Sequence, residues 1–239
     1  MLGKVALVEP AMLAKDTLMA ASIGSLLKSA SVIHQVRNHA AVGVELEEFT
    51  VSYETVARRM RKARAAISYH NSVRRLTQKY GIDLFFGQAT FIDPQTLEIN
   101  GEVLHFQHCC LNPDPRPLLI DLPVPYCTPA ALLEMATLPA SLTIVGQDKT
   151  ACELAQTFVR IGTAVTILAS APLLGLAPEA AQVVERGLVA DGVQVEHCTS
   201  PVFRHLLNEE MNLVECELPD GRIFLTELVF VSQDPIPCC

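Results

Sequence analysis

Short apolar runs alternate with helical patterns from residue 142 to residue 232, and this alternation constrains the fold more than any other feature of the sequence. A strand predicted at Leu142–Val145 precedes a helix that ends near Ile161, and a hairpin turning at Asp220-Gly221 precedes a last strand at Leu228–Ser232. The other predicted elements are a strand at Val165–Leu168, a helix at Pro178–Ala190, a strand at Val193–Glu196, and hairpin strands at Val214–Leu218 and Ile223–Leu225. This order predicts an α/β, doubly wound (βαβ) nucleotide-binding domain with a β-hairpin or meander insertion.

The turn after the first of these strands reads VGQDKTACELAQ, where a dinucleotide-binding turn has the pattern G-x-G-x-x-G. Gly146 keeps the glycine that the tight turn needs, and Ala151 is small enough for the helix to pack on the strand. Asp148 replaces the second glycine, so its carboxylate obstructs and repels a diphosphate, although Lys149 would offset part of that charge. Two interpretations stay open: a cofactor site for NAD(P)H, or a Rossmann-like turn that binds nothing.

The second strand of this domain ends in TILASAPLL. An acidic residue at this place favours a free ribose 2′-hydroxyl, and a nearby arginine favours a 2′-phosphate. The chain has Ala169 and Ser170 there. Ser170 is therefore a candidate cofactor contact, and the sequence does not choose between NADH and NADPH.

The first half of the chain predicts a strand at Lys4–Val8 and a helix over residues 17–40, and Thr50 or Ser52 is expected to cap a long helix that runs to about Tyr80. Strands bounded by turns at Asp93-Pro94 and Asn100-Gly101 are then predicted at Asp83–Phe86, Gln88–Ile92, Leu97–Ile99 and Glu102–Cys110. The proline-rich stretch NPDPRPLLIDLPVP that follows predicts a linker.

The charge of the chain argues against two classes of partner. The 239 residues carry a formal net charge of −8, whereas a nucleic-acid binder presents a basic face. Basic residues gather in one helical stretch, where they predict a solvated or partner-facing side: Arg58, Arg59, Arg61, Lys62 and Arg64. No apolar run approaches the roughly 20 residues of a membrane span, and no signal peptide is recognised. We expect no nucleic acid, no membrane and a cytoplasmic location.

Eight cysteines are scattered through the chain without a C-x-x-C pair, which fits reduced thiols that act as small buried hydrophobes. Cys109 and Cys110 fall in a predicted strand, where neighbouring side chains point to opposite faces, so we interpret them as structural. The vicinal pair Cys238 and Cys239 has two interpretations: a soft-metal site, or the accidental end of a truncated reading frame.

Three segments together resemble one family: LVEPAMLAKDTLMAASIGSLLKSA, PYCTPAALLEMATLPASLTIVGQDKTACELAQTFVRIGTAVTILASAPLL and APEAAQVVERGLVADGVQVEHCT. The chain resembles the FAD-dependent pyridine nucleotide–disulfide oxidoreductases, nearest to the mercuric reductase and dihydrolipoamide dehydrogenase-like branch. The resemblance is most specific over residues 125–199. It implies a partial FAD-binding Rossmann-like domain at residues 1–117, a complete NAD(P)-binding domain at residues 118–237, and FAD and NAD(P)H as cofactors.

In that family, hydride from NAD(P)H reaches a flavin and then a cysteine pair spaced C-x-x-x-x-C at the start of a helix. Thr17 and Ser22 hold that spacing here, and hydroxyls cannot form a disulfide, so the thiol step and mercuric reduction are not expected at these positions. Glu9 matches the acid that holds the FAD ribose. Glu153 matches a flavin-proximal glutamate whose lysine partner is missing, so we expect Glu153 to be exposed, protonated or re-paired, with Lys28 as a candidate.

The resemblance also implies that the family's first strand, its glycine-rich FAD turn and its dimerisation domain are absent from this chain, so the oligomeric state stays open. Three hypotheses follow. The first is a flavin- and nicotinamide-dependent oxidoreductase that passes electrons to an unidentified acceptor. The second is a non-catalytic remnant that binds dinucleotides or serves as an interaction module. The third is a thiol-based soft-metal binder.

Overall fold

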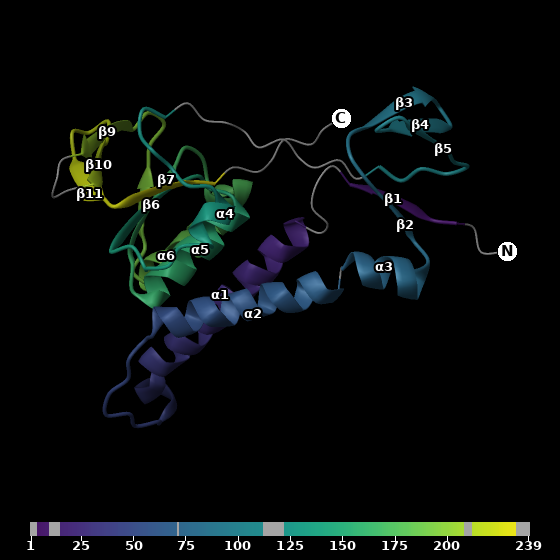
Figure 1. Ribbon diagram of the computed structural model, residues 1–239. Helices are drawn as coiled ribbons and strands as arrows, with labels where there is room; N and C mark the ends of the chain where they lie inside the picture. The colour runs from purple at the N-terminus through teal and green to yellow at the C-terminus, as the bar shows by residue number, and fades with distance from the viewer. Residues whose placement is uncertain (1–3, 10–14, 71, 112–121, 208–211, 233–239) are drawn as a thin grey trace. The chain divides into compact units, whose positions relative to one another are not determined.

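The computed structural model describes residues 4–9, 15–70, 72–111, 122–207 and 212–232. The chain divides into two compact units, Met1–Ser22 with Arg61–Asp114 and Ile23–Met60 with Pro115–Cys239 (Figure 1). The later boundary falls within the predicted linker, whereas the middle segment clusters with the C-terminal half of the chain. The domain limits at residues 1–117 and 118–237 therefore stay a prediction.

The first unit contains a parallel strand pair and an antiparallel sheet. Strand β1 (Ala6–Glu9) pairs in parallel with β2 (Asp83–Phe86). Helix α3 (Val73–Tyr80) precedes β2 and ends at Gly81, whose φ of 63° is the left-handed conformation that glycine adopts most readily. The antiparallel sheet has the order β3-β4-β5, made of β3 (Ala89–Asp93), β4 (Thr96–Ile99) and β5 (Glu102–His105).

The turn residues predicted from the sequence close these strands. Asn100 and Gly101 have φ of 51° and 85°, the pair of positive values that a tight hairpin turn between twisted strands requires. At the other turn, the Asp93 carboxylate accepts a hydrogen bond of 2.7 Å from the backbone N–H of Gln95. The β-hairpin predictions for this stretch are confirmed.

Two predictions for the first half of the chain are wrong. The single long helix ending at Tyr80 is two helices, α2 (Tyr53–His70) and α3, with Asn71-Ser72 in the sequence between them. Ser72, the N-cap of α3, has extended backbone with φ of −66° and ψ of 146°, so the helix does not continue through it. Ser52 does act as the predicted cap, because its Oγ accepts a hydrogen bond of 3.3 Å from the backbone N–H of Thr55.

The second wrong prediction concerns Cys109 and Cys110. Strand β5 ends at His105, and both cysteines are exposed in irregular backbone beyond it. The predicted strand to Cys110 is therefore too long, because the last backbone pairing with β4 joins Thr96 to His105.

The second unit is built on a four-stranded parallel sheet in the order β12-β6-β7-β8. The strands are β6 (Ser141–Val145), β7 (Ala164–Ala169), β8 (Gln194–His197) and β12 (Leu228–Val231). Helix α5 (Lys149–Ile161) crosses from β6 to β7, and α6 (Pro178–Ala190) crosses from β7 to β8. A short helix, α4 (Pro129–Leu132), precedes β6. This confirms the doubly wound α/β prediction.

The insertion has one strand more than the predicted hairpin. Strands β9 (Val202–Leu207), β10 (Asn212–Glu217) and β11 (Ile223–Thr226) form an antiparallel meander. The predicted turn joins β10 and β11, where the Asp220 carboxylate accepts a hydrogen bond of 3.0 Å from the backbone N–H of Arg222.

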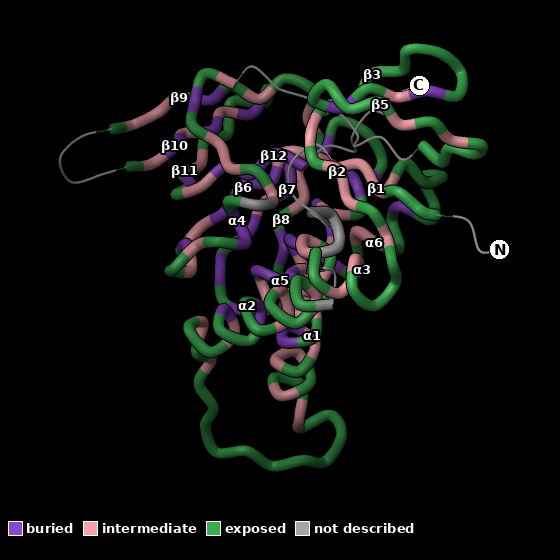
Figure 2. The backbone as a smooth tube through the Cα atoms, turned by 45° about the vertical axis from the view of Figure 1, so that its right-hand side comes forward, coloured by how far each residue is buried: buried purple, intermediate pink, exposed green. Residues whose placement is uncertain are grey.

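The parallel sheet carries a different layer on each face, which Figure 1 shows as green helices on one side and the yellow meander on the other. Ile167 and Phe230 pack with Phe158 of α5 in the helix-side core. Their neighbours in the strands, Leu168 and Val229, pack instead with the meander. Alternation along each strand explains the two cores, and the buried backbone in Figure 2 follows these strands and α5.

Part of the first two helices belongs to this second unit. Helix α1 spans Lys15–Arg37, and Leu26 and Ala30 on it are buried. His34 Nδ1 lies 2.9 Å from the carboxylate of Asp191, whose side chain is only 5% exposed. Asp191 also accepts hydrogen bonds from Gln156 at 2.7 Å and Arg160 at 2.8 Å, so one buried carboxylate joins α1, α5 and the end of α6.

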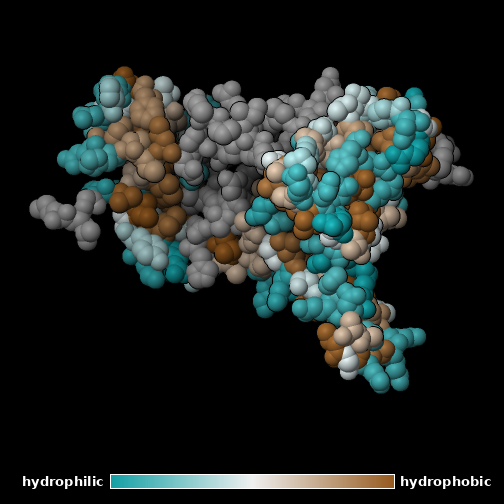
Figure 3. Space-filling model, turned by 180° about the vertical axis from the view of Figure 1, so that it is seen from behind, coloured by the Kyte–Doolittle hydropathy of each residue, from teal (hydrophilic) through white to brown (hydrophobic). Residues whose placement is uncertain are grey.

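The loop between α1 and α2 is the most exposed described segment of this unit. A short 3-10 turn, η1 (His39–Val42), opens it, and every residue from 40 to 50 is exposed. Figure 3 shows it at the lower right, where hydrophobic and hydrophilic atoms are mixed. Among the basic residues predicted to be solvated on α2, Arg58, Arg59, Arg61 and Lys62 are exposed, and Arg64 is partly buried. Within the described part of the chain, no helix has the length and apolarity needed to cross a membrane.

Candidate functional site

The turn between β6 and α5 lies at the carboxyl edge of the parallel sheet, where doubly wound proteins bind ligands. Gly146 has φ of 148°, and its N–H donates to the Leu168 carbonyl at 3.0 Å. A Cβ at this position would collide with the carbonyl oxygen of Ser232, which follows β12. Gly146 is therefore required by the close approach of the neighbouring strand, whether or not a ligand binds.

Asp148 is the N-cap of α5 and is almost completely buried, with 8% of its surface exposed. Its Oδ1 accepts a hydrogen bond of 2.7 Å from the backbone N–H of Ala151. The hydroxyl of Ser232 lies 2.7 Å from the same oxygen and 2.9 Å from Oδ2. The carboxylate thus occupies the place at the helix N-terminus where a bound phosphate would accept these hydrogen bonds.

Lys149 pairs within the helix instead of facing Asp148. Its Nζ lies 3.6 Å from Oε1 of Glu153, one helical turn away, and the side chains are 79% and 32% exposed. Glu153 is therefore partly exposed and paired with Lys149, not with the suggested Lys28. Such an exposed pair adds only about 0.3–0.5 kcal/mol.

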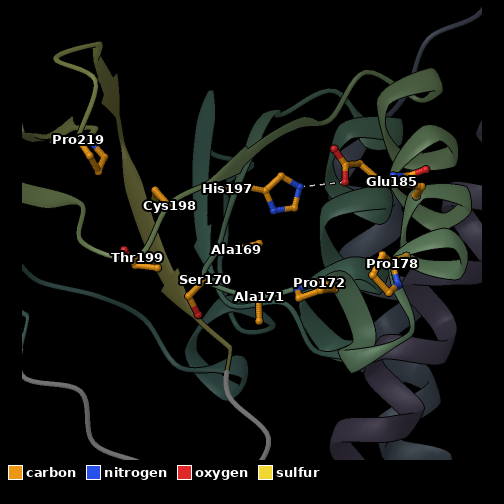
Figure 4. Close-up of a pocket in the computed structure, with 12 residues that line it drawn as sticks. Ala169, Ser170, Ala171, Pro172, Pro178, Glu185, His197, Cys198, Thr199 and Pro219 are labelled. Carbon is orange, nitrogen blue, oxygen red and sulfur yellow. Dashed lines mark hydrogen bonds and ion pairs between the residues drawn. The ribbon is translucent and has the colours of Figure 1, made fainter.

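A cavity of about 730 Å³ opens beside this turn, at the ends of β7 and β8 and along one face of α6 (Figure 4). Ser170 lies at its edge, and its hydroxyl donates a hydrogen bond of 3.3 Å to the Gln147 side chain of the glycine turn. The volume is in the range of small-molecule sites. The predicted contact Ser170 and the predicted turn are thus brought to one place by the sheet.

Two polar residues that the sequence did not single out are paired in the lining of this cavity. His197 at the end of β8 reaches toward Glu185 on α6, with Nε2 and Oε2 2.9 Å apart (Figure 4). Neither belongs to a motif, and they are 12 residues apart in the chain. Only the packing of α6 against β8 brings them together. Ser232, the partner of Asp148, was missed for the same reason.

Three of the residues predicted for flavin chemistry, Glu9, Thr17 and Ser22, lie in the first unit, whereas Glu153 lies in the second. Glu9 ends β1 and is partly buried. Thr17 and Ser22 both lie on α1, and the buried Ser22 hydroxyl donates to the Leu18 carbonyl at 2.9 Å. Ser22 is therefore occupied with its own helix backbone. The role of Glu9 in holding an FAD ribose stays a prediction.

The described thiols are poor nucleophiles where they are buried. Burial raises the pKa of Cys127 and Cys152 to about 11 and that of Cys216 to about 12. A thiol with such a pKa is protonated at neutral pH and reacts slowly. Among the described residues, no group of three or more His, Cys, Asp or Glu side chains is arranged to hold a metal ion. Cys238 and Cys239 lie outside the described residues.

A parallel sheet with a glycine turn, a helix N-terminus and an open cavity at its carboxyl edge defines the class of doubly wound dinucleotide-binding folds. The chain belongs to the pyridine nucleotide-disulphide oxidoreductase family, which matches residues 3–233. This establishes the relationship that the three sequence segments suggested.

Individual relatives agree with this assignment. The chain is 29% identical over 126 residues to a mercuric reductase of Staphylococcus aureus, covering 50% of this chain and 23% of that enzyme. It is 30% identical over 192 residues to the dihydrolipoyl dehydrogenase of Bacillus subtilis (strain 168), covering 75% and 41%. The HOCl-induced flavoprotein disulfide reductase RclA from Escherichia coli shares the fold, with a TM-score of 0.75 at 19% identity over 99% of this chain and 52% of its own. The chain thus spans about half or less of the length of these relatives.

Proposed function

We propose that this chain holds a nicotinamide dinucleotide at the carboxyl edge of its parallel sheet, as the NAD(P)H-binding part of a flavin-linked oxidoreductase. The observation that carries the proposal is the cavity at the ends of β7 and β8 beside the Gly146 turn. In doubly wound domains the adenosine of the cofactor lies beyond the second strand and its diphosphate at the first helix N-terminus. Ser170 and the cavity suit the adenosine half.

The diphosphate half fits less well, because the Asp148 carboxylate already accepts the N–H of Ala151. A dinucleotide then loses hydrogen bonds at the helix N-terminus and meets a like charge. We therefore expect weak binding that relies on the adenosine cavity. The residues for this half remain proposals: Gly146, Asp148, Ala151, Glu153 and Ser170.

The flavin part of the proposal rests on family membership alone. A bound flavin would accept hydride from NAD(P)H and pass electrons to a diffusible acceptor. Thr17 and Ser22 provide hydroxyls where the family has its cysteine pair, so the proposed activity has no disulfide step at these positions. Mercuric reduction by the chain as given is not expected.

The experiment is a fluorescence titration of the purified chain with NADH, together with a visible spectrum before and after FAD is added under anaerobic conditions. Saturable NADH binding supports the proposal, and a flavin band that bleaches with NADH supports its oxidoreductase part. A protein that binds neither ligand, both as the wild type and as Asp148→Gly, would instead be a remnant without cofactor function.

A further inference from the structure

The cavity at the ends of β7 and β8 has an unusual balance of charge for a site that could take either nicotinamide dinucleotide. Half of its lining residues are alanine or proline, which suits the flat face of a purine. Among the described residues that line it, none is lysine or arginine, and Glu185 is the one carboxylate. Its Oε2 is held 2.9 Å from His197 Nε2, so the acidic group is anchored inside the cavity wall (Figure 4).

Further carboxylates stand behind the β8 side of the cavity. Burial raises the pKa of Cys198, a lining thiol, and the negative charges of Glu196 and Asp220 raise it further. Arg222 does not supply a free positive charge there, because its guanidinium is bound to Glu196 at 2.6 Å and to Asp220 at 2.7 Å. One guanidinium between two carboxylates leaves this cluster with a net negative charge, which disfavours an anionic ligand in the cavity.

One cation lies close by on α6. Arg186 is exposed outside the set of lining residues, and its Nε donates to the Gln182 carbonyl of its own helix at 3.3 Å. Arg186 would have to leave that contact before it could pair with a 2′-phosphate in the cavity. The arrangement differs from sites in which an arginine at the end of the second strand receives the phosphate.

Building on the proposed function, we propose that this cavity selects an adenosine with a free 2′-hydroxyl, so that the chain prefers NADH to NADPH, with Glu185 as the specificity-determining residue and His197 as its positioning partner. The sequence alone left this choice open, because Ser170 at the end of β7 is neither acidic nor basic. A ribose 2′-hydroxyl can donate to a carboxylate, whereas a 2′-phosphate brings about two negative charges toward it.

The test is a titration of the purified chain with NADH and with NADPH at low and at high salt. We expect NADH to bind at least tenfold more tightly at low salt, and the ratio to shrink at high salt because screening weakens the repulsion of the phosphate. Glu185→Gln should bring the two affinities within about threefold of each other, mainly by improving NADPH binding. Ser170→Arg should also favour NADPH, since it adds the cation that such sites use.

Glu179→Gln is the matched control, because it removes one negative charge from an exposed position of the same helix that does not line the cavity. It should leave the NADH to NADPH ratio unchanged. Equal binding of both dinucleotides by the wild type, or an unchanged ratio in Glu185→Gln, would overturn the assignment of specificity while leaving the proposed function intact. Binding of neither dinucleotide by the wild type and by Asp148→Gly would remove the proposed function, and the inference would fall with it.

Discussion

The hydroxyl of Ser232 lies 2.7 and 2.9 Å from the two carboxylate oxygens of Asp148, although the residues are 84 positions apart in the chain. Ser232 follows the last strand of the sheet, and Asp148 caps the helix after β6. The contact places an internal anion at the helix N-terminus, hydrogen-bonded and shielded from water. In this chain the protein itself supplies the negative charge that a bound diphosphate supplies in a dinucleotide complex.

Replacing this internal anion should improve cofactor binding. In Asp148→Gly the N–H groups of α5 become available, and we expect NADH to bind about tenfold more tightly. The free energy of unfolding should fall by about 1–2 kcal/mol, since a cap is lost and the buried Ser232 hydroxyl loses its acceptor. Fluorescence titration and urea denaturation measure the two effects.

Asp148→Ser separates charge from capping. A serine hydroxyl also caps a helix but carries no charge. Tighter NADH binding in both variants assigns the effect to the carboxylate charge. Tightening in the glycine variant alone assigns it to side-chain bulk, and unchanged affinity in both would show that this turn does not limit binding.

Replacing Gly146 or Gly24 with alanine should change the free energy of unfolding in opposite directions. Gly146→Ala adds a Cβ that collides with the Ser232 backbone at a φ of 148°, so we expect a loss of at least about 2 kcal/mol in the free energy of unfolding. Gly24 lies within α1, and a Cβ added there would meet nothing within 4 Å, so alanine should stabilise by up to about 1 kcal/mol. Thermal unfolding of both variants measures this. A neutral Gly146→Ala would refute the close approach of the two backbones.

Asp191 should matter far more to stability than the histidine it contacts. Asp191→Ala leaves Arg160, whose side chain is 18% exposed, without its carboxylate, and we expect a loss of about 3 kcal/mol or more. His34→Ala removes a side chain that is 42% exposed and should cost under about 1 kcal/mol. Urea denaturation of both variants measures which one loses more free energy of unfolding. Equal losses in the free energy of unfolding would mean that the contact of α1 with Asp191 contributes more to stability than the pairing of the Asp191 charge with Arg160.

The exposed and buried thiols should differ in how fast they are alkylated. Exposed Cys109 and Cys110 should react with iodoacetamide at pH 8 before buried Cys152 and Cys216, as read by peptide mass spectrometry.

The pKa of Cys152 is raised from 9 to about 11 because burial disfavours the thiolate. The buried, protonated Cys152 thiol therefore stabilises the fold fully below pH 9, and this contribution to the free energy of unfolding is lost as the pH rises to about 11. Stability that is flat from pH 8 to 11 would contradict this burial.

Periodicity and turn chemistry were enough for most of the local structure. Apolar strands and helical patterns predicted α6 at Pro178–Ala190 as found, and Asn100-Gly101 predicted its hairpin. These features depend on residues that are neighbours in the sequence, so the sequence alone is enough to predict them. The predictions failed where local propensity and pairing diverge: the break between α2 and α3, the end of β5 before Cys109, and the additional strand β9.

By itself, the sequence determined the family and the doubly wound order of strands and helices, and it predicts that Thr17 and Ser22 stand where the family has its redox pair. Only the tertiary structure decided what the nucleotide turn does. It brings Ser232 to Asp148 and His197 to Glu185, contacts between side chains on different elements. Such contacts arise from the packing of strands and helices that are distant in the chain, so no periodicity or motif in the sequence predicts them.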